Sequence, residues 1–246
     1  MPIDPVCGRE IDLRSAHSMK IVHGRALYFC SEACESAFRT QPQRYQEVSA
    51  QMRLAVGVMG SAAEDEPDEG RHAAYRLGEA IANQGFILIT GACPGLPYEA
   101  ACGAKAAGGQ SVGISPALSL HEHLYRYHSP ADAFDVLVYT GSGLMGREVT
   151  NIHSSDMVVV LGGRSGTLGE FAIAYDEGKL IGVLQGTGGI TDEIERITDI
   201  IDKDTGALLI FSPDPVDLVT RLSSTYENRH FRRPSCFCDA KAIPGH

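Results

Sequence analysis

The sequence predicts an α/β protein in which a doubly wound, mostly parallel sheet follows a small cysteine-bearing module. Residues 1–48 hold three of the seven cysteines, together with aromatic residues and short strand-like pieces. Residues 49–228 alternate apolar runs with glycine-rich turns and helical segments. Such alternation is typical of parallel strands joined by right-handed helical crossovers. Residues 229–246 are interpreted as a C-terminal tail.

The apolar runs predict seven strands. Each is short, nearly continuous and rich in β-branched residues, which favours strands covered on both faces. They cover residues 54–60, 86–90, 110–115, 134–140, 156–161, 180–184 and 207–211. The helical segments between them cover residues 69–84, 97–107, 146–154, 168–177, 191–202 and 214–225. The acidic stretch after the first strand is typical of a solvated loop that enters a helix.

The charge, the length of the apolar runs and the number of cysteines limit the classes of function that we expect for this protein. The net charge of −10 disfavours nucleic-acid binding, which needs a clustered basic face. No apolar run approaches the roughly 20 residues that cross a bilayer, and the N-terminus lacks the order of a secretion signal. An odd number of cysteines favours metal binding or free thiols over a disulfide framework. We therefore expect a cytoplasmic protein with a small-molecule partner and no membrane association.

The first module carries candidate metal ligands. Cys30 and Cys34 are spaced so that a turn into a helix can bring both thiolates to one ion, with Cys7 arriving from a preceding knuckle. Zinc or another soft divalent metal suits such thiolates. His23 or His17 could fill a fourth position. The alternative is that Cys30 and Cys34 are small buried side chains.

Three motifs of this module occur in a specific order. They are DPVCG from residue 4, LYFCSEACESAF from residue 27 and QPQRY from residue 41. Together they resemble the YHS domain, a small relative of the treble-clef metal-binding modules. The resemblance covers about the first 45 residues and implies a metal site that serves either structure or metal sensing and delivery.

Glycine-rich loops follow four of the predicted strands. They span residues 57–61, 90–96, 140–148 and 162–170. In an open α/β sheet, the carboxyl ends of the strands line the crevice in which ligands bind. The first two loops supply the candidate ligand-binding residues Gly60, Ser61, Gly91 and Gly95.

The fourth loop is the most informative, because it joins an apolar strand to a helix start. Its candidate phosphate-binding residues are Gly163, Arg164, Ser165, Gly166 and Thr167. Glycines allow close approach of backbone to ligand, and the free N–H groups of a helix N-terminus favour an anion. Glu170 lies one turn into the helix, where its carboxylate could accept hydrogen bonds from ribose hydroxyls or activate water.

These loops carry a second resemblance. TGACPGL, followed by GREVTNIHSSDMVVVLGGRSGTLGEFAIAYDEGKLIGVL, resembles the LOG-type phosphoribohydrolases and the wider SLOG superfamily of nucleotide-ligand proteins, over roughly residues 54–225. The resemblance implies a Rossmann-like fold and a homodimer. It also implies that Gly163, Gly166 and Thr167 bind phosphate. Glu170 matches the catalytic glutamate of the PGGxGTxxE motif, and Arg147 matches the upstream catalytic arginine.

The sequence departs from this pattern in several places. Gly162 replaces the leading proline, Arg164 replaces the second glycine, and Glu148 replaces a lysine after the upstream arginine. These departures are typical of a divergent branch, in which fold and nucleotide-like ligand carry over better than activity. Two functions therefore stay open. One is hydrolysis of the N-glycosidic bond of a nucleoside 5′-monophosphate. The other is a noncatalytic nucleotide-binding sensor coupled to the metal module.

The remaining candidates favour structural interpretations. Asp156 is typical of a turn residue, and Cys102 is expected to pack in a helix of small residues. Cys93 lies in a ligand-facing loop. The histidines in HEHLYRYH, from residue 121, favour an irregular loop or ligand lid over a metal site. In the tail, Cys236, Cys238 and His246 either form part of a frayed terminus or add metal ligands.

Overall fold

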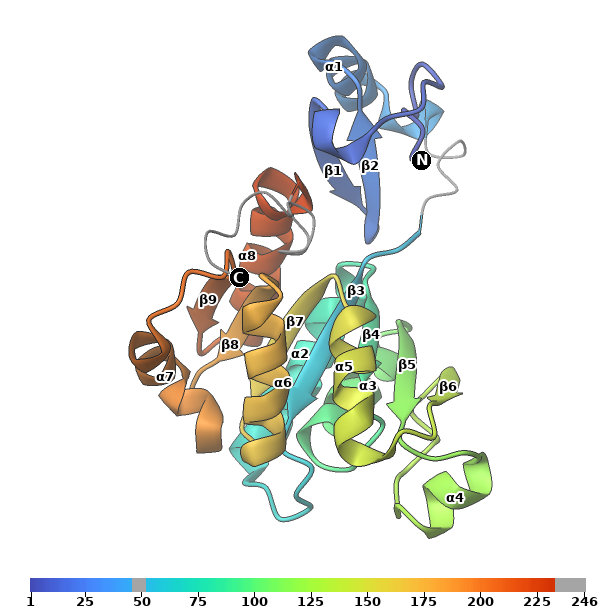
Figure 1. The fold of residues 1–246 in the computed structure, drawn as a ribbon. Coiled ribbons are helices and arrows are strands. Elements are labelled where there is room, and N and C mark those ends of the chain that lie inside the picture. The colour runs from blue at the N-terminus through green and yellow to red at the C-terminus, as the bar shows by residue number, and fades with distance from the viewer. Residues whose placement is uncertain (46–51, 233–246) are drawn as a thin grey trace.

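A computed structural model describes residues 1–45 and 52–232 (Figure 1). The predicted module boundary at residues 48 and 49 lies outside these ranges, as do Cys236, Cys238 and His246. None of the helices in the two ranges combines the length and apolarity that crossing a bilayer requires.

The N-terminal module is a hairpin followed by a helix. The 3-10 turn Leu13–Ser15 leads into β1 (Ser18–Val22), which pairs antiparallel with β2 (Arg25–Phe29). Helix α1 (Glu32–Thr40) starts where the Ser31 side chain accepts a hydrogen bond from the Cys34 amide, and a second 3-10 turn covers Pro42–Arg44. Leu27, Phe29 and Phe38 form a small core of their own.

The second part is built on a seven-stranded sheet in which every strand pair is parallel. The strands are β3 (Ala55–Gly60), β4 (Ile87–Thr90), β5 (Gln110–Ser115), β6 (Val136–Tyr139), β7 (Met157–Leu161), β8 (Leu180–Leu184) and β9 (Leu208–Ser212). Their order is β6-β5-β4-β3-β7-β8-β9. The chain therefore winds outward from β3 to one edge and from β7 to the other, which confirms the predicted doubly wound fold.

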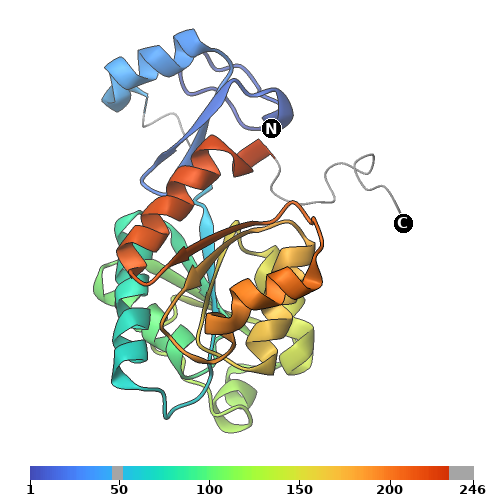
Figure 2. The ribbon, with the colours of Figure 1, turned by 90° about the vertical axis from the view of Figure 1, so that its left-hand side faces the viewer.

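Helices cover both faces of this sheet (Figures 1 and 2). On one face, α2 (Asp68–Asn83), α3 (Leu96–Ala106) and α8 (Pro215–Asn228) bury Leu77, Leu96 and Leu218 in the larger core. On the other, α5 (Gly143–His153), α6 (Ser165–Asp176) and α7 (Ile194–Ile201) bury Ile152, Phe171 and Ile194. Double coverage explains why the central strands β3, β7 and β8 are apolar throughout, whereas the edge strand β6 stays largely exposed.

Several element boundaries differ from the predicted ones. Helices α5 and α6 each begin three residues earlier than predicted, at Gly143 and Ser165, because the first turn of a helix accepts glycine and serine. The segment expected to be irregular forms the short helix α4 (Leu120–Tyr125), capped by the Ser119 hydroxyl. The segment predicted as one helix over 191–202 divides into the 3-10 turn Gly189–Glu193 and α7.

The N-terminal module packs against the amino-terminal edge of the sheet, beside α8 (Figure 2). Met19 and Ala26 belong to the larger core, so the two parts share one apolar interior. The Glu227 carboxylate of α8 accepts hydrogen bonds from the Lys20 ammonium and the Ile21 amide. The 3-10 turn His230–Arg232 brings Phe231 against Tyr28. The first residues of the predicted tail are therefore packed.

Candidate functional site

A cleft opens where the strand order reverses, at the carboxyl ends of β3 and β7. It has a volume of about 470 Å³. Nine of the eleven predicted catalytic and ligand-binding residues line it: Gly60, Ser61, Gly91, Arg147, Arg164, Ser165, Gly166, Thr167 and Glu170. The topology thus brings four separate loops to one place, as expected for the switch point of a doubly wound sheet.

Two predicted residues do not line this cleft. Gly95 borders a neighbouring hollow of about 480 Å³, which is also lined by Ala63, Tyr98 and His128. Gly163 has a φ of +92°, and a side chain there would overlap that of Thr167. Its role in the structure is to let the loop turn tightly beneath the start of α6.

The start of α6 offers unpartnered backbone donors to the cleft. Arg164 occupies the N-cap position, and its side chain forms no capping hydrogen bond with the first turn. The N–H groups at the start of an α-helix have no partner within the helix, and the helix dipole favours negative charge at that end. Because Ser165, Gly166 and Thr167 line the cleft, an anion could be held there by backbone donors.

Arg147 enters the cleft from α5 and is 8% exposed. Its Nη1 donates a hydrogen bond to the Ile114 carbonyl at 3.3 Å, and its Nε has no partner. The guanidinium lies so close to Gly91 that any side chain at that position would overlap it. Among the described residues it forms no ion pair with Glu148, Asp156 or Glu170, and Asp156 instead accepts a hydrogen bond from the Ala55 amide.

Glu170 is 7% exposed and reaches the same cleft from α6. Burial raises the pKa of its carboxyl from the usual 4.5 to about 7. Arg147 opposes this rise, while Glu148 adds to it. The Asn151 amide donates a hydrogen bond to Glu170 Oε1 at 3.4 Å and also contacts the Met59 sulfur. A carboxyl that titrates near neutral pH can both release and accept a proton in one reaction.

The sequence prediction missed several cleft residues. Glu148, which is buried on α5, and Leu144 and Met145, which are exposed at its first turn, line the cleft. The buried Asn151 does not line it but donates a hydrogen bond to Glu170. Asn151 lies four residues after Arg147, a helical spacing that would have placed both on one face. Cys93 also lines the cleft. Burial raises the pKa of the Cys93 thiol, and nearby Arg147 opposes that rise.

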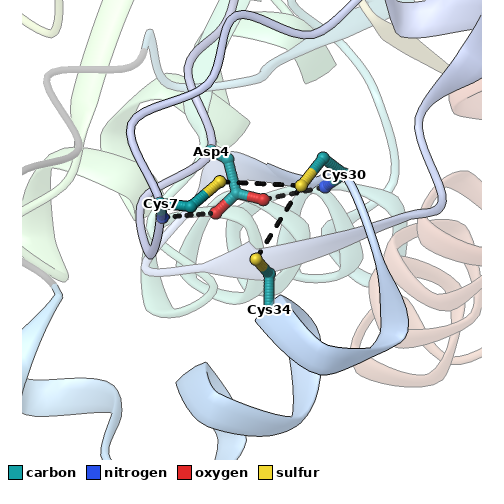
Figure 3. A group of neighbouring side chains, drawn as sticks. All are labelled: Asp4, Cys7, Cys30 and Cys34. Carbon is teal, nitrogen blue, oxygen red and sulfur yellow. Dashed lines mark hydrogen bonds between the residues drawn. The ribbon is translucent and has the colours of Figure 1, made fainter.

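A second group of candidate site residues lies in the N-terminal module. Asp4, Cys7, Cys30 and Cys34 bring their ligand atoms within 4.8 Å of one another (Figure 3). The Cys30 sulfur lies 3.6 Å from that of Cys7 and 3.8 Å from that of Cys34. Two thiolates on one tetrahedral zinc ion, each at about 2.3 Å, would be about 3.8 Å apart. The spacing therefore fits a soft divalent ion.

Asp4 organises the two loops that carry these cysteines. It is fully buried, and its carboxylate accepts hydrogen bonds from the amides of Val6 and Cys7 on one loop and of Cys30 on the other. Burial raises the pKa of the Asp4 carboxyl, but these donors together lower it below the usual value. The carboxylate is therefore ionised and could join the three sulfurs around a cation.

The structure does not bring His17 or His23, the suggested fourth ligands, to the three cysteines. The group beside the cysteines is Asp4, while His17 lies near Glu35 and His23 forms the β1–β2 turn, with a φ of +49°. The HEHLYRYH segment contributes no metal cluster within the described ranges. There, His123 is buried and its ring contacts the Ser115 hydroxyl and the Pro130 carbonyl.

The fold and the cleft define a class: Rossmann-like proteins with a ligand site at the switch point of a parallel sheet. Comparison with known proteins places the chain more narrowly. It belongs to the SLOG cluster4 family, which it matches over residues 53–215. An uncharacterized protein of Archaeoglobus fulgidus is 37% identical over 132 residues, which are 54% of this chain and 80% of that protein.

Solved structures agree with this assignment. TM1055, a structural-genomics target, has a TM-score of 0.60 at 27% identity and covers 70% of this chain and 99% of its own. The molybdenum cofactor binding protein of Rippkaea orientalis has a TM-score of 0.57 at 29% identity, with 70% and 98% covered. The molybdenum cofactor carrier protein of Chlamydomonas reinhardtii has the same TM-score at 30% identity and the same coverage.

Proposed function

We propose that the cleft binds a nucleoside 5′-monophosphate and hydrolyses its N-glycosidic bond. The observation that carries the proposal is the convergence of Arg147, Glu170 and the uncapped start of α6 on one cleft. Arg147 and Glu170 come from different helices and were predicted as a pair from the sequence alone. Their proximity supports a joint role.

The geometry suggests a separate role for each group in the reaction. The amides of Ser165 to Thr167 bind the 5′-phosphate, and Arg164 adds positive charge at the cleft. Rupture of the glycosidic bond leaves positive charge on the ribose ring, so an ionised Glu170 stabilises the transition state more than the ground state. Water adds to the anomeric carbon, one of its protons leaves with the base, and ribose 5-phosphate remains. Arg147 orients the phosphorylated sugar.

Release of free adenine from AMP tests this proposal. We expect turnover by the wild type and a loss of at least 100-fold in Glu170→Gln, because the amide cannot carry charge or exchange the proton. The matched control is Glu195→Gln on the exposed surface of α7, which should retain full turnover. Absence of turnover with all common nucleoside monophosphates would reject the hydrolase.

A second candidate function is binding without turnover, as a nucleotide-ligand sensor or a carrier. It is favoured by the departures at Gly162, Arg164 and Glu148, and by two similar proteins, one that binds and one that carries the molybdenum cofactor. Under this alternative, AMP or the molybdenum cofactor binds tightly and is recovered unchanged. Mass spectrometry of the ligand after prolonged incubation distinguishes the two candidates.

For the N-terminal module we propose a YHS-like, treble-clef-like site that holds one zinc ion through Cys7, Cys30 and Cys34, with Asp4 beside them. The sulfur spacing supports this proposal. We expect one zinc per chain by mass spectrometry. The double variant Cys30→Ser/Cys34→Ser should lose it, whereas the control Cys102→Ser, on α3, should keep it. Zinc retained in the double variant would contradict the assignment.

We further propose that two copies of the chain associate through the surface formed by α5 and the edge strand β6. This surface exposes Val136, Val138, Leu144, Met145 and Val149, and exposed apolar side chains suit self-association. Sedimentation should show a dimer that Met145→Asp converts to a monomer. Ile200→Asp, at an exposed apolar site on α7, serves as the control.

The free thiols described by the structure suit a cytoplasmic location.

A further inference from the structure

Glu148 is a largely buried residue whose carboxylate opens into the cleft. It is 7% exposed and lines the cleft from α5. Within the described residues it accepts no hydrogen bond and forms no ion pair. Arg147 acts on it only through longer-range attraction. Its oxygens are open to the cleft, so a ligand that enters the cleft can donate to a carboxylate that none of the described residues satisfies.

The surroundings of Glu148 keep its carboxylate next to the start of α6. Its Oε2 lies 3.1 Å from the position that a Cβ atom on Gly169 would occupy, and its Oε1 lies 3.7 Å from the corresponding position on Gly166. The two glycines let α5 approach α6 closely at this point. The carboxylate therefore lies beside the phosphate-binding turn and near Glu170, which is the next residue after Gly169.

We propose that Glu148 is a specificity-determining residue that accepts hydrogen bonds from the adjacent hydroxyls of the ligand's ribose. This inference rests on the proposed nucleotide ligand. The carboxylate would repel a phosphate, and the neighbouring Arg147 would repel a cationic group. Neutral hydroxyl donors satisfy both constraints. With the 5′-phosphate on the first turn of α6 and the glycosidic bond at Glu170, the sugar lies between them, within reach of Glu148.

The test compares the affinity of AMP with that of 2′-deoxy-AMP by calorimetry. A site that hydrogen-bonds a hydroxyl rejects an analogue lacking it, because a buried polar group then stays unpaired. We expect the wild type to bind AMP at least 10-fold more tightly than 2′-deoxy-AMP. In Glu148→Ala the ratio should fall to about 2-fold, mainly through weaker AMP binding. Glu195→Gln should keep the wild-type ratio.

The melting temperature of the unliganded protein provides a second readout. The isosteric Glu148→Gln removes a charge that partial burial disfavours, so the variant should melt at a higher temperature than the wild type. A merely structural carboxylate would give the opposite shift. This measurement also reports on folding of the variant before the binding comparison.

Three results would overturn the inference: equal affinity of the wild type for both nucleotides, an unchanged ratio in Glu148→Ala, or no binding of either nucleotide. Failure of the hydrolase proposal is distinguishable. A wild type that prefers AMP but releases no adenine rejects hydrolysis and keeps the role of Glu148. Turnover of AMP and 2′-deoxy-AMP at equal affinity keeps hydrolysis and rejects that role.

Discussion

Close contact between the backbone and a side chain fixes Arg147 in the cleft. The guanidinium occupies the space that a side chain on Gly91 would need, and it donates to the backbone of β5. A glycine is needed at position 91 because the guanidinium lies so close to the backbone. The backbone dihedral angles do not require it, since the φ of Gly91 is not positive. A change at Gly91 therefore acts on the cleft directly.

Replacement of Gly91 by alanine should displace the Arg147 guanidinium and weaken AMP binding at least 10-fold, with little loss of stability, because only the far end of a flexible side chain has to move. The matched control is Gly70→Ala in α2, where the new methyl group would lie 3.8 Å from Leu96, an ordinary contact. That variant should bind normally. Calorimetry and thermal melts measure both effects, and normal binding by Gly91→Ala would contradict the placement of Arg147.

Glu170 makes stability depend on pH. Below about pH 4.5 the carboxyl is protonated in the folded and the unfolded chain and contributes no difference. Between 4.5 and about 7 the unfolded chain releases a proton that the folded chain retains, so the free energy of unfolding falls as pH rises. The loss is roughly 3 kcal/mol, at 1.36 kcal/mol per pKa unit.

Glu170→Gln removes this dependence. Its melting temperature should exceed that of the wild type by a margin that grows from pH 4.5 to 7 and is constant above pH 7. Thermal melts across pH 4 to 8 measure the margin, with the surface variant Glu195→Gln as control. A margin that does not change with pH would show that the carboxyl titrates normally.

At the residue scale, the sequence predicted groups that lie in recognisable motifs. Arg147 and Glu170 were found because of the spacing around their glycine loops. Glu148 was noticed only as a departure, because nothing in a linear sequence shows that a helix buries a carboxylate without a partner. Asp4 was missed as a possible metal ligand for a related reason. Its position depends on backbone amides of two loops that only the fold brings together.

At the scale of elements, the N-terminal hairpin is held to the sheet mainly by close packing. The turn at Gly24 lies against Gly85, and a side chain at either position would overlap the other's backbone. The Gly24 carbonyl accepts a hydrogen bond from the Leu54 amide, just before β3. The Lys20–Glu227 pair adds an ion pair at 2.7 Å, but the lysine is partly exposed.

These contacts predict unequal effects. Gly24→Ala combines a positive φ of +73° with backbone overlap, so it should lower the melting temperature by several degrees and expose the hairpin to protease. Glu227→Gln should cost at most about 1 kcal/mol, because partly exposed ion pairs contribute little. Thermal melts and limited proteolysis compare the two. Equal destabilisation would show that the ion pair, and not the turn, anchors the hairpin.

The elements themselves were predictable because both cores impose simple patterns. Strands buried on both faces, such as β7 and β8, form continuous apolar runs, and the more exposed edge strand β6 has an apolar run as well, so all seven strands of the sheet were found. Helix starts were less predictable, since Gly143 and Ser165 belong to glycine loops that continue into helices without a change of composition. The helix α4 was missed because its turn depends on the Ser119 cap and on burial of His123, a tertiary contact.

At the scale of the whole molecule, the N-terminal module and the cleft lie at opposite ends of the parallel strands. The hairpin of the metal module contacts the chain just before β3, and the cleft begins at the other end of that strand, at Gly60. Six residues of β-strand span about 20 Å. The intervening strands β3 and β7 are buried, and such close-packed elements do not deform readily.

This separation distinguishes the two candidate functions. If the protein is a hydrolase, removal of zinc by a chelator should lower the melting temperature and leave the turnover of AMP within about 2-fold at a temperature where the protein stays folded. If it is a metal-coupled sensor, zinc should change nucleotide affinity by 5-fold or more, in keeping with a coupling free energy of about 1 kcal/mol. Parallel titrations of the zinc-loaded and zinc-free protein decide between them.

The account depends most on the anion site formed by the first turn of α6 in the cleft. Calorimetric titration of AMP and of adenosine into the wild-type protein tests it directly, because the two ligands differ only in the phosphate. The account predicts that AMP binds at least 10-fold more tightly and that this advantage shrinks as salt is added. Equal affinities for AMP and adenosine would contradict it.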